Sequence, residues 1–277
     1  MTSHNRRDST LSALAAVGRQ RSMPTGTVLR THLVDADSTD GTVDAVRRQY
    51  PSVRLRSVGS EVFWGEGMRI ASRDSRSADA SGWTHQLWLN DDVELDDDAV
   101  ATLLATARDV GGDAVVVGAV RARPSVTADP GRTTYSGRSR RGRVLDLVEP
   151  CGRPEPCDTY NGNVVLLPRV VLERVGDIDR RFKHGMGDYD HGFRVRRAGF
   201  RSFVAPRHVG VCDANPPLAG SREPGIGVRA ALRRVTSQRE LPPRQWWLYC
   251  LRHNWPWAPL LLVSPYVRTA VRAAAAR

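Results

Sequence analysis

The sequence predicts an α/β fold in which helices flank a doubly wound, mostly parallel β-sheet. Apolar strands alternate with helices through the first half of the chain, which is the pattern of such sheets. Polar and acidic clusters directly follow two of the expected strands, after Val34 and after Leu89. Ligands of doubly wound sheets bind beyond the carboxyl ends of the strands, so these two clusters mark a candidate site.

The first half of the chain justifies this alternation element by element. A helix is expected over residues 10–20, where Leu11, Leu14 and Val17 recur at helical spacing, and a buried strand over 28–34. An acidic first turn favours a helix over residues 98–110 because of the helix dipole. The remaining expected elements are helices at 42–50 and 68–77, and strands at 53–58, 86–89 and 114–120.

The second half divides at a change of composition. Residues 121–159 are rich in Arg, Gly and Pro, lack periodicity and are expected to form a long excursion near a site. Strands at 164–167 and 202–205 and helices at 168–175 and 189–198 follow. Prolines, tryptophans and arginines then dominate. We expect a main domain over residues 1–215 and a Pro-punctuated linker with a helical tail over 216–277.

The charge balance points to an anionic partner. The chain of 277 residues has 41 Lys and Arg against 30 Asp and Glu, a net charge of +11. Nucleic acid, an anionic membrane face and phosphorylated small molecules all suit this charge. The four cysteines form no CxxC pair, which excludes a zinc ribbon and favours reduced thiols. No apolar run is long enough for a helix to span a bilayer, and a cytoplasmic location is expected.

The first polar cluster begins at Asp35. Ser38, Thr39 and Asp40 follow it and are good N-caps for the next helix. Capping leaves Asp35 itself unexplained. A carboxylate at this strand end is suited to accept hydrogen bonds from a base or a ribose.

The second cluster is Asn90, Asp91 and Asp92, directly after an apolar strand. Paired carboxylates supply the hard oxygen ligands that Mg²⁺ or Mn²⁺ prefers. A solvated acidic turn that caps the next helix is the alternative.

The third cluster lies where a glycine-flanked loop enters a helix bearing Asp188, Asp190 and His191. The functional interpretation is a general base presented at the helix start. An N-cap at Asp188 is the plainer alternative. A metal cluster that includes His184 is disfavoured, because the spacing fits no common ligand motif. The basic run at residues 138–143 suits phosphate contact, but a solvated loop is the commoner explanation, and no RNA-binding aromatic platform accompanies it.

Taken in order, these clusters resemble family 2 glycosyltransferases, which are inverting enzymes of the GT-A fold, and rhamnosyltransferases among them. Residues 34–42 look like the family's VDxxSTDGT signature, and residues 89–92 look like its DxD-type metal motif. Three further segments are similar to family motifs: the nucleotide-binding loop at 2–7, the acceptor-side segment at 161–164 with 175–179, and the helix with the catalytic base at 187–199.

The resemblance implies roles by position. The nucleotide sugar would be bound by Ser3, His4, Asn5, Arg6, Asp35, Asp37, Asn90 and Asp91. Asp92 would hold the metal, and His208 is a further candidate ligand, with a structural histidine as the alternative. Asp188 would be the catalytic base, and the acceptor side would include Gly162, Asn163 and Asp190.

The implied reaction is a metal-dependent, inverting transfer with Mg²⁺ or Mn²⁺ as cofactor. The donor would be a nucleotide-diphosphate sugar, dTDP-rhamnose or a UDP-sugar, and the acceptor a glycan or lipid-linked hydroxyl of the cell envelope. The Trp- and Arg-rich tail suits peripheral contact with an anionic membrane, on its inner face, and a hydrophobic cover for the core is the alternative. No nucleic acid partner is expected.

Two departures from the family pattern motivate an alternative. The family has a strand before the loop at 2–7, so a sheet lacking its first strand, or a truncated start, is expected here. Gly187 stands at the first position of the family's acidic pair, which leaves Asp188 as the candidate base. A non-catalytic nucleotide-sugar-binding relic is therefore one alternative function, and a basic nucleic-acid-binding protein is a second.

Overall fold

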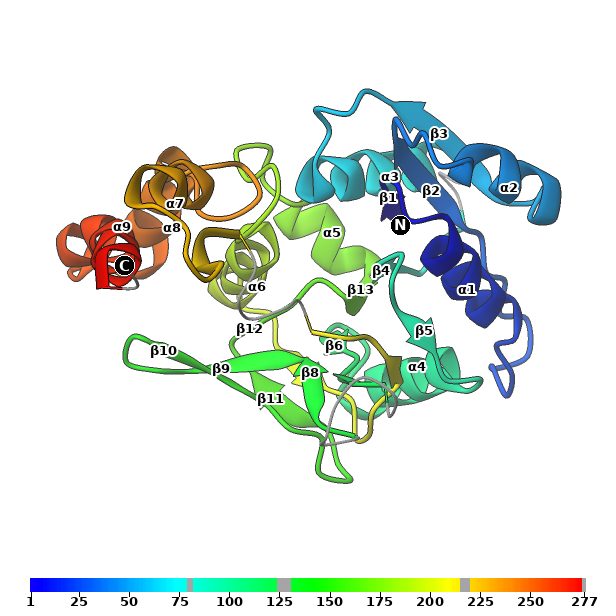
Figure 1. The fold of residues 1–277 in the computed structure, drawn as a ribbon. Helices are drawn as coiled ribbons and strands as arrows, with labels where there is room; N and C mark the ends of the chain where they lie inside the picture. Colours follow the sequence, from blue (N-terminus) through cyan, green and yellow to red (C-terminus); the bar gives the residue numbers. More distant parts are fainter. Residues whose placement is uncertain (79–81, 124–130, 215–219, 276–277) are drawn as a thin grey trace.

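The computed structural model describes residues 1–78, 82–123, 131–214 and 220–275. Its N-terminal part is a parallel sheet in the order β1 (Thr2–Ser3), β2 (His32–Ala36) and β3 (Arg54–Val58). Three helices pack with these strands: α1 (Arg7–Gly18), α2 (Thr42–Gln49) and α3 (Trp64–Ala78) (Figure 1). The predicted alternation of strands and helices is confirmed here. β2 begins at His32 rather than at residue 28, and Val28 is 72% exposed.

A five-stranded sheet forms the centre of the molecule. Its order is β11 (Glu155–Cys157), β14 (Ser202–Val204), β6 (Val115–Val117), β13 (Val164–Pro168) and β4 (His85–Leu89). β14 and β6 are parallel, whereas β13 runs antiparallel to both β6 and β4. The helices α4 (Ala99–Asp109), α5 (Arg169–Val175) and α6 (Gly187–Arg197) complete this part. The predicted α/β fold is therefore present, with β13 and β11 as its antiparallel members.

The excursion at residues 121–159 is not irregular in its described part. β8 (Thr133–Tyr135) joins β7 (Val120–Arg121), β15 (Gly210–Val211) and β5 (Glu94–Leu95) in one small sheet. β9 (Gly137–Arg141), β10 (Val144–Leu147) and β12 (Thr159–Tyr160) form another. Sequence patterning missed these strands because they are only two to five residues long, and because β9 carries arginines instead of alternating apolar side chains.

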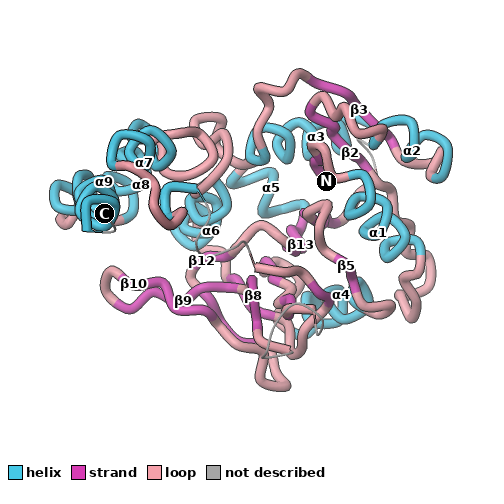
Figure 2. The backbone as a smooth tube through the Cα atoms, in the orientation of Figure 1, coloured by secondary structure: helices cyan, strands magenta, loops and turns pink. Residues whose placement is uncertain are grey.

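The tail is helical, as predicted, and it packs against the rest of the chain. α7 (Val228–Val235), α8 (Pro243–His253) and α9 (Ala258–Ala275) lie together at the end of the molecule away from β1–β3, and Figure 2 shows this part as helix and loop. A hydrophobic cluster joins the two parts: Phe182, Met186 and Phe193 pack with Tyr249, Cys250 and Ala258. A membrane-crossing helix would need more length and apolar character than any helix in the described residues has. The predicted linker falls partly on residues 215–219, which lie outside the described residues.

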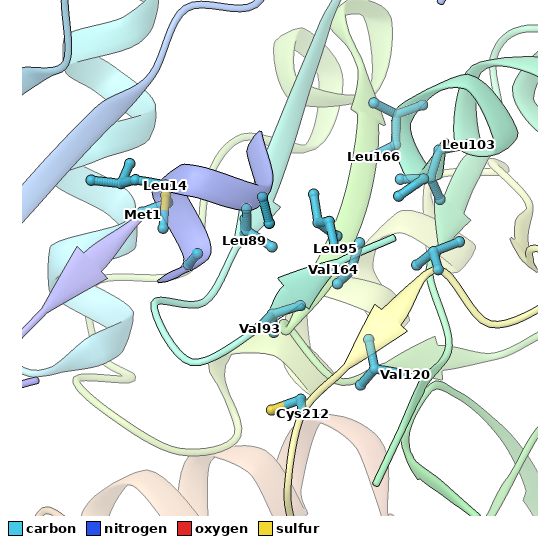
Figure 3. Packing of buried hydrophobic residues seen from close by; sticks show 14 of the residues in the cluster. Met1, Leu14, Leu89, Val93, Leu95, Leu103, Val120, Val164, Leu166 and Cys212 are labelled. Carbon is cyan, nitrogen blue, oxygen red and sulfur yellow. The ribbon is translucent and has the colours of Figure 1, made fainter. Parts of the chain in front are cut away.

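The start of the chain lies in the main hydrophobic core. Figure 3 shows Met1 close to Leu14, within the cluster that also holds Leu89 and Val93. The Met1 ammonium donates to the backbone carbonyl of His32 at 2.9 Å, and burial lowers its pKa to about 5. An apolar-lined cavity of about 680 Å³ adjoins Met1 and is bordered by residues of β2, β4, α3 and α4. Thr2–Ser3, which was expected to belong to a loop, forms a short strand paired with β2, so the sheet has a first strand where none was expected.

The packing of α6 on β12 gives a first testable expectation. A Cβ added at the buried Gly192 would lie 2.7 Å from the Thr159 Cα, a backbone atom that cannot move aside cheaply. Gly192→Ala is therefore expected to lower the free energy of unfolding by about 1–3 kcal/mol in urea denaturation. Gly18→Ala is the control, because nothing lies within 4 Å of its added Cβ. Equal stability of the two variants would contradict the tight contact.

Candidate active site

Two loops meet at the carboxyl ends of β1 and β2. The Asn5 side-chain oxygen accepts the Thr39 N–H at 2.7 Å, and the Asn5 N–H donates to the Ser38 hydroxyl at 2.8 Å. Asn5 and Asp37 have left-handed backbone angles, with φ of 50° and 58°. His4 lies alongside, its Nδ1 2.6 Å from the Ala36 carbonyl oxygen. The structure thus brings together the predicted nucleotide-binding residues of both loops and leaves His4, Asn5 and Asp37 exposed.

Asp35 differs from its neighbours because its side chain is fully buried. One carboxylate oxygen accepts the Ser38 N–H at 2.9 Å, and the other accepts the Ser38 hydroxyl at 2.6 Å. In this structure Asp35 shapes the turn that carries Asp37. Ser3 is also buried, and its hydroxyl is 2.8 Å from that of Thr10. Contact of Asp35 or Ser3 with a nucleotide stays a prediction.

The acidic pair after β4 is neutralised by Arg6. The Arg6 Nη1 donates to the Asp92 Oδ2 at 2.5 Å and lies 3.4 Å from the Asp91 Oδ1. Burial raises the pKa of Asp91 to about 6, with Arg6 opposing the shift. Burial alone would lower the pKa of Arg6, but the two carboxylates outweigh it and raise that pKa. The sequence placed Arg6 in the nucleotide loop but gave no sign of this ion pair. Asp91 and Asp92 lie 85 and 86 positions after Arg6 along the chain.

The donors around this pair partly fit a divalent cation. The buried Oδ2 of Asp91 has no hydrogen-bond partner, and the Asp92 side chain is 31% exposed. Mg²⁺ and Mn²⁺ accept few protein ligands when water and phosphate oxygens complete the shell. Within the described ranges, however, no group of three or more His, Cys, Asp or Glu side chains is arranged to hold a metal. A cation bound through Asp92 would have to displace Arg6.

The predicted ligand His208 lies in a different environment. Its Nε2 is 2.7 Å from the Thr133 hydroxyl, which also hydrogen-bonds Glu149. Burial lowers the pKa of His208 and so favours the neutral ring. The side chain next to Asp92 is instead Cys212, four residues further on, whose Sγ is 3.6 Å from the Asp92 Oδ1. The structure therefore favours the structural alternative for His208.

Trp64 connects the second and third clusters, and sequence reasoning missed it. Its Nε1 donates to the Asn90 side-chain oxygen at 2.7 Å. A Cβ on Gly162 would lie 2.5 Å from the Trp64 ring, so only glycine allows this approach. The Gly162 N–H in turn donates to the Asp188 Oδ2 at 2.9 Å. The available signal was the position of Trp64 directly before Gly65, at the start of α3.

Asp188 has the surroundings of a proton acceptor. Burial raises the pKa of its carboxyl, and hydrogen bonds from the backbone N–H groups of Gly162 and Tyr189 oppose the shift. The preceding Gly187 has no room for a side chain, because a Cβ there would lie 2.8 Å from the Ile178 Cγ2. The departure from the family's acidic pair is therefore built into the packing.

Asp190 has a structural role that corrects its predicted place on the acceptor side. Its side chain is fully buried and contacts the Arg194 Nε at 2.8 Å and both the Arg252 Nη1 and His253 Nε2 at 2.9 Å. These hydrogen bonds outweigh burial and lower the pKa of Asp190 to about 2. The carboxylate ties α6 to α8 and is closed to an acceptor.

The other residues of this region are also structural. Asn163 is buried, and its backbone carbonyl accepts the Asn90 N–H at 3.0 Å. His191 lies between the Tyr160 hydroxyl and the Gly176 carbonyl, and burial lowers its pKa to about 3. His191 is thus engaged within the core through both of its ring nitrogens.

The α/β fold and this polar edge are typical of proteins of the GT-A fold. The family model for glycosyl transferase family 2 matches residues 1–163, and the chain belongs to that family. The chain is 28% identical over 205 residues to the N-acetylglucosaminyl-diphospho-decaprenol L-rhamnosyltransferases of two Mycobacterium tuberculosis strains, CDC 1551 / Oshkosh and ATCC 25618 / H37Rv. The match covers 63% of this chain and 63% of the length of those relatives.

Solved structures show the same fold. The mannosyltransferase PcManGT of Pyrobaculum calidifontis, in complex with GDP-Man and Mn²⁺, aligns with a TM-score of 0.56 at 19% identity, covering 99% of this chain and 72% of that one. S. aureus TarS 1-349 in complex with UDP-GlcNAc aligns with a TM-score of 0.56 at 10% identity, covering 97% and 80%.

The ion pair between Arg6 and Asp92 leads to a prediction about the affinity for a divalent cation. Arg6→Ala removes a competing cation from Asp92, so the Kd for Mn²⁺ alone should fall about two- to fivefold, the equivalent of a surface ion pair. Electron paramagnetic resonance of free Mn²⁺ measures this without turnover. Arg7→Ala is the matched control, because Arg7 pairs with Asp8 on the surface. Weaker Mn²⁺ binding by Arg6→Ala would contradict the competition.

The Asp190 contacts predict a large effect on stability. Asp190→Asn leaves the partly buried Arg194 without its carboxylate and Arg252 with Asp179 alone, and it should cost about 3–5 kcal/mol of unfolding free energy. Asp74→Asn, which breaks the exposed pair with Arg56, should cost about 1 kcal/mol or less. Urea denaturation compares the two, and a similar loss in both would rule out the anchoring role.

Proposed function

We propose that this protein transfers a sugar from a nucleotide-diphosphate sugar to a hydroxyl of a glycan or lipid-linked acceptor in cell-envelope or surface polysaccharide synthesis. The observation that carries the proposal is the junction of Asn90, Trp64, Gly162 and Asp188, which places a carboxylate of raised pKa beside the polar loops. The acceptor named for the curated relatives is a decaprenol-linked sugar, and their name supports rhamnose as the transferred group.

Each side chain has a part in the proposed reaction. His4, Asn5 and Asp37 are exposed and meet the nucleotide, while the buried Asp35 shapes their loop. Asp188 accepts the proton of the acceptor hydroxyl as its oxygen attacks the anomeric carbon. The bond to the diphosphate breaks in the same displacement, so the anomeric configuration inverts. Arg6 contacts the acidic pair directly. Once the Arg6 side chain leaves Asp92, it is suited to meet the departing diphosphate.

A divalent cation belongs to this proposal as a cofactor held by Asp92, with Asp91 behind it. When bound, Mg²⁺ or Mn²⁺ would neutralise charge on the diphosphate leaving group. The Mn²⁺ in the structure of PcManGT supports this choice. The fit rests on the unpartnered Asp91 oxygen and the exposed Asp92 carboxylate.

The division of the chain at residue 215 and a cytoplasmic location are also part of this proposal. The relic alternative is separated from an enzyme by one test, which is whether the unsubstituted protein turns over a nucleotide sugar.

Asp188→Asn should lower kcat by about 10²–10⁴-fold, because the amide cannot accept the acceptor proton. Burial raises the pKa of Asp188 above 3.8. In the unsubstituted protein, kcat/KM should therefore fall as the pH drops through this raised pKa, because the protonated carboxyl group cannot accept the acceptor proton. A radiolabelled transfer assay, with the donor chosen by thermal shift among UDP-, GDP- and dTDP-sugars with and without Mn²⁺, measures both.

The control for this experiment is Asp74→Asn, which changes a partly exposed carboxylate outside the site and should retain full activity. Thermal shift by the nucleotide should persist in Asp188→Asn, which separates lost chemistry from lost binding. Unchanged turnover in Asp188→Asn would favour another base, and no turnover in any variant would favour the relic.

A further inference from the structure

The tail carries most of the exposed large hydrophobic side chains among the described residues. Those of α8, α9 and the loop between them are Trp247, Leu251, Trp255, Trp257, Leu260, Val263, Val267 and Val271. Soluble proteins scatter such side chains singly over their surface. Their concentration in one segment therefore points to a partner surface.

On α9 these side chains form one stripe. Leu260, Val263, Val267 and Val271 recur at intervals of three and four residues, so they share one face of the helix. They are 64%, 58%, 51% and 62% exposed, whereas Thr269 and Ala273 on another face are buried. The helix thus buries one face in the protein and presents an apolar face outward.

The charge along α8 and α9 has a single sign. The sequence contains no Asp or Glu after Glu240, but it has five arginines there. Arg244 and Arg268 are exposed. A surface of this composition attracts anions as well as apolar groups.

The basic hairpin formed by β9 and β10 adjoins this surface. At the turn between β9 and β10, Arg141, Arg143 and Val144 are exposed, and Val144 is 59% exposed. The Arg143 guanidinium lies over the Trp257 ring, 4.9 Å from its centre. The hairpin turn and the α8–α9 loop therefore form one continuous patch of arginine and aromatic side chains.

We propose that the tail surface, defined as the α9 stripe with Trp255, Trp257, Arg143 and Arg268, docks into the headgroup region of an anionic lipid bilayer. Tryptophans favour the interface, apolar stripes enter it, and arginines meet lipid phosphates. The tail surface extends the proposed function, because a lipid-linked acceptor lies in a membrane. Through Asp190, α8 is tied to the helix that carries Asp188, so docking would also orient the candidate base.

The test is sedimentation of the full chain with large vesicles, in the absence of donor and acceptor. Phosphatidylcholine vesicles containing phosphatidylglycerol should bind the protein, and phosphatidylcholine alone should bind it much less, with binding falling as salt rises. Tryptophan emission should shift to the blue on binding. Because no turnover is measured, failure here leaves the transfer reaction untouched, and failure of transfer leaves vesicle binding untouched.

Three double variants locate the contact. Leu260→Gln with Val267→Gln should weaken the partition coefficient about tenfold or more for anionic vesicles. Arg143→Ala with Arg268→Ala should weaken the same partition coefficient by a similar factor, because two positive charges that meet lipid phosphates are lost. Val28→Gln with Val170→Gln removes exposed apolar groups elsewhere and should leave binding unchanged.

Absence of vesicle binding, or equal binding by all three variants, would overturn the proposal. Sedimentation velocity provides the remaining outcome. If the chain self-associates with rising concentration, and Leu260→Gln with Val267→Gln abolishes that association while vesicles bind nothing, the stripe is a contact between copies and the membrane proposal is wrong.

Discussion

The arrangement of the candidate site depends on one buried charge. Asp190 lies two residues after Asp188 on the same helix, and its carboxylate is held by Arg194, Arg252 and His253. A carboxylate removed from water is tolerated only when its oxygens are satisfied by such partners, so α6 and α8 cannot separate without exposing unpaired charge. The position of Asp188 is therefore set by a contact on the far side of its own helix, and the C-terminal helices form part of the scaffold of the site.

A second electrostatic feature governs the opposite side of the site. Asp91 and Asp92 lie next to each other at the end of β4, and two neighbouring carboxylates repel unless a cation lies between them. Arg6 supplies that cation from the first loop. The loop at residues 3–7 is thus held both by its hydrogen bonds to residues 38–40 and by this ion pair. The Arg6 guanidinium is therefore held at this edge of the sheet before any ligand binds.

Much of the fold was open to prediction, because its strands and helices carry strong local patterns. The alternation from α1 to β6 and the three polar clusters follow from apolar periodicity and from acids placed at strand ends. The contacts that combine the clusters were not open to prediction. Trp64 reaches Asn90 and Gly162 only through tertiary packing, and no local pattern distinguishes it from a core tryptophan. The role of Asp190 was misjudged for the same reason, since its partners Arg252 and His253 lie more than sixty residues away.

The glycine before Asp188 has a consequence for how such a site is tuned. Ile178 and Phe182 fill the space where a side chain at position 187 would lie, so no second carboxylate adjoins Asp188. Where two acids share a site, their repulsion sets the proton affinity of one of them. Here a single carboxyl group, that of Asp188, is enclosed by its neighbours, and this burial raises its pKa instead. Substitutions among the uncharged residues that bury this carboxyl group would accordingly shift the pKa of Asp188 without changing any charge in the site.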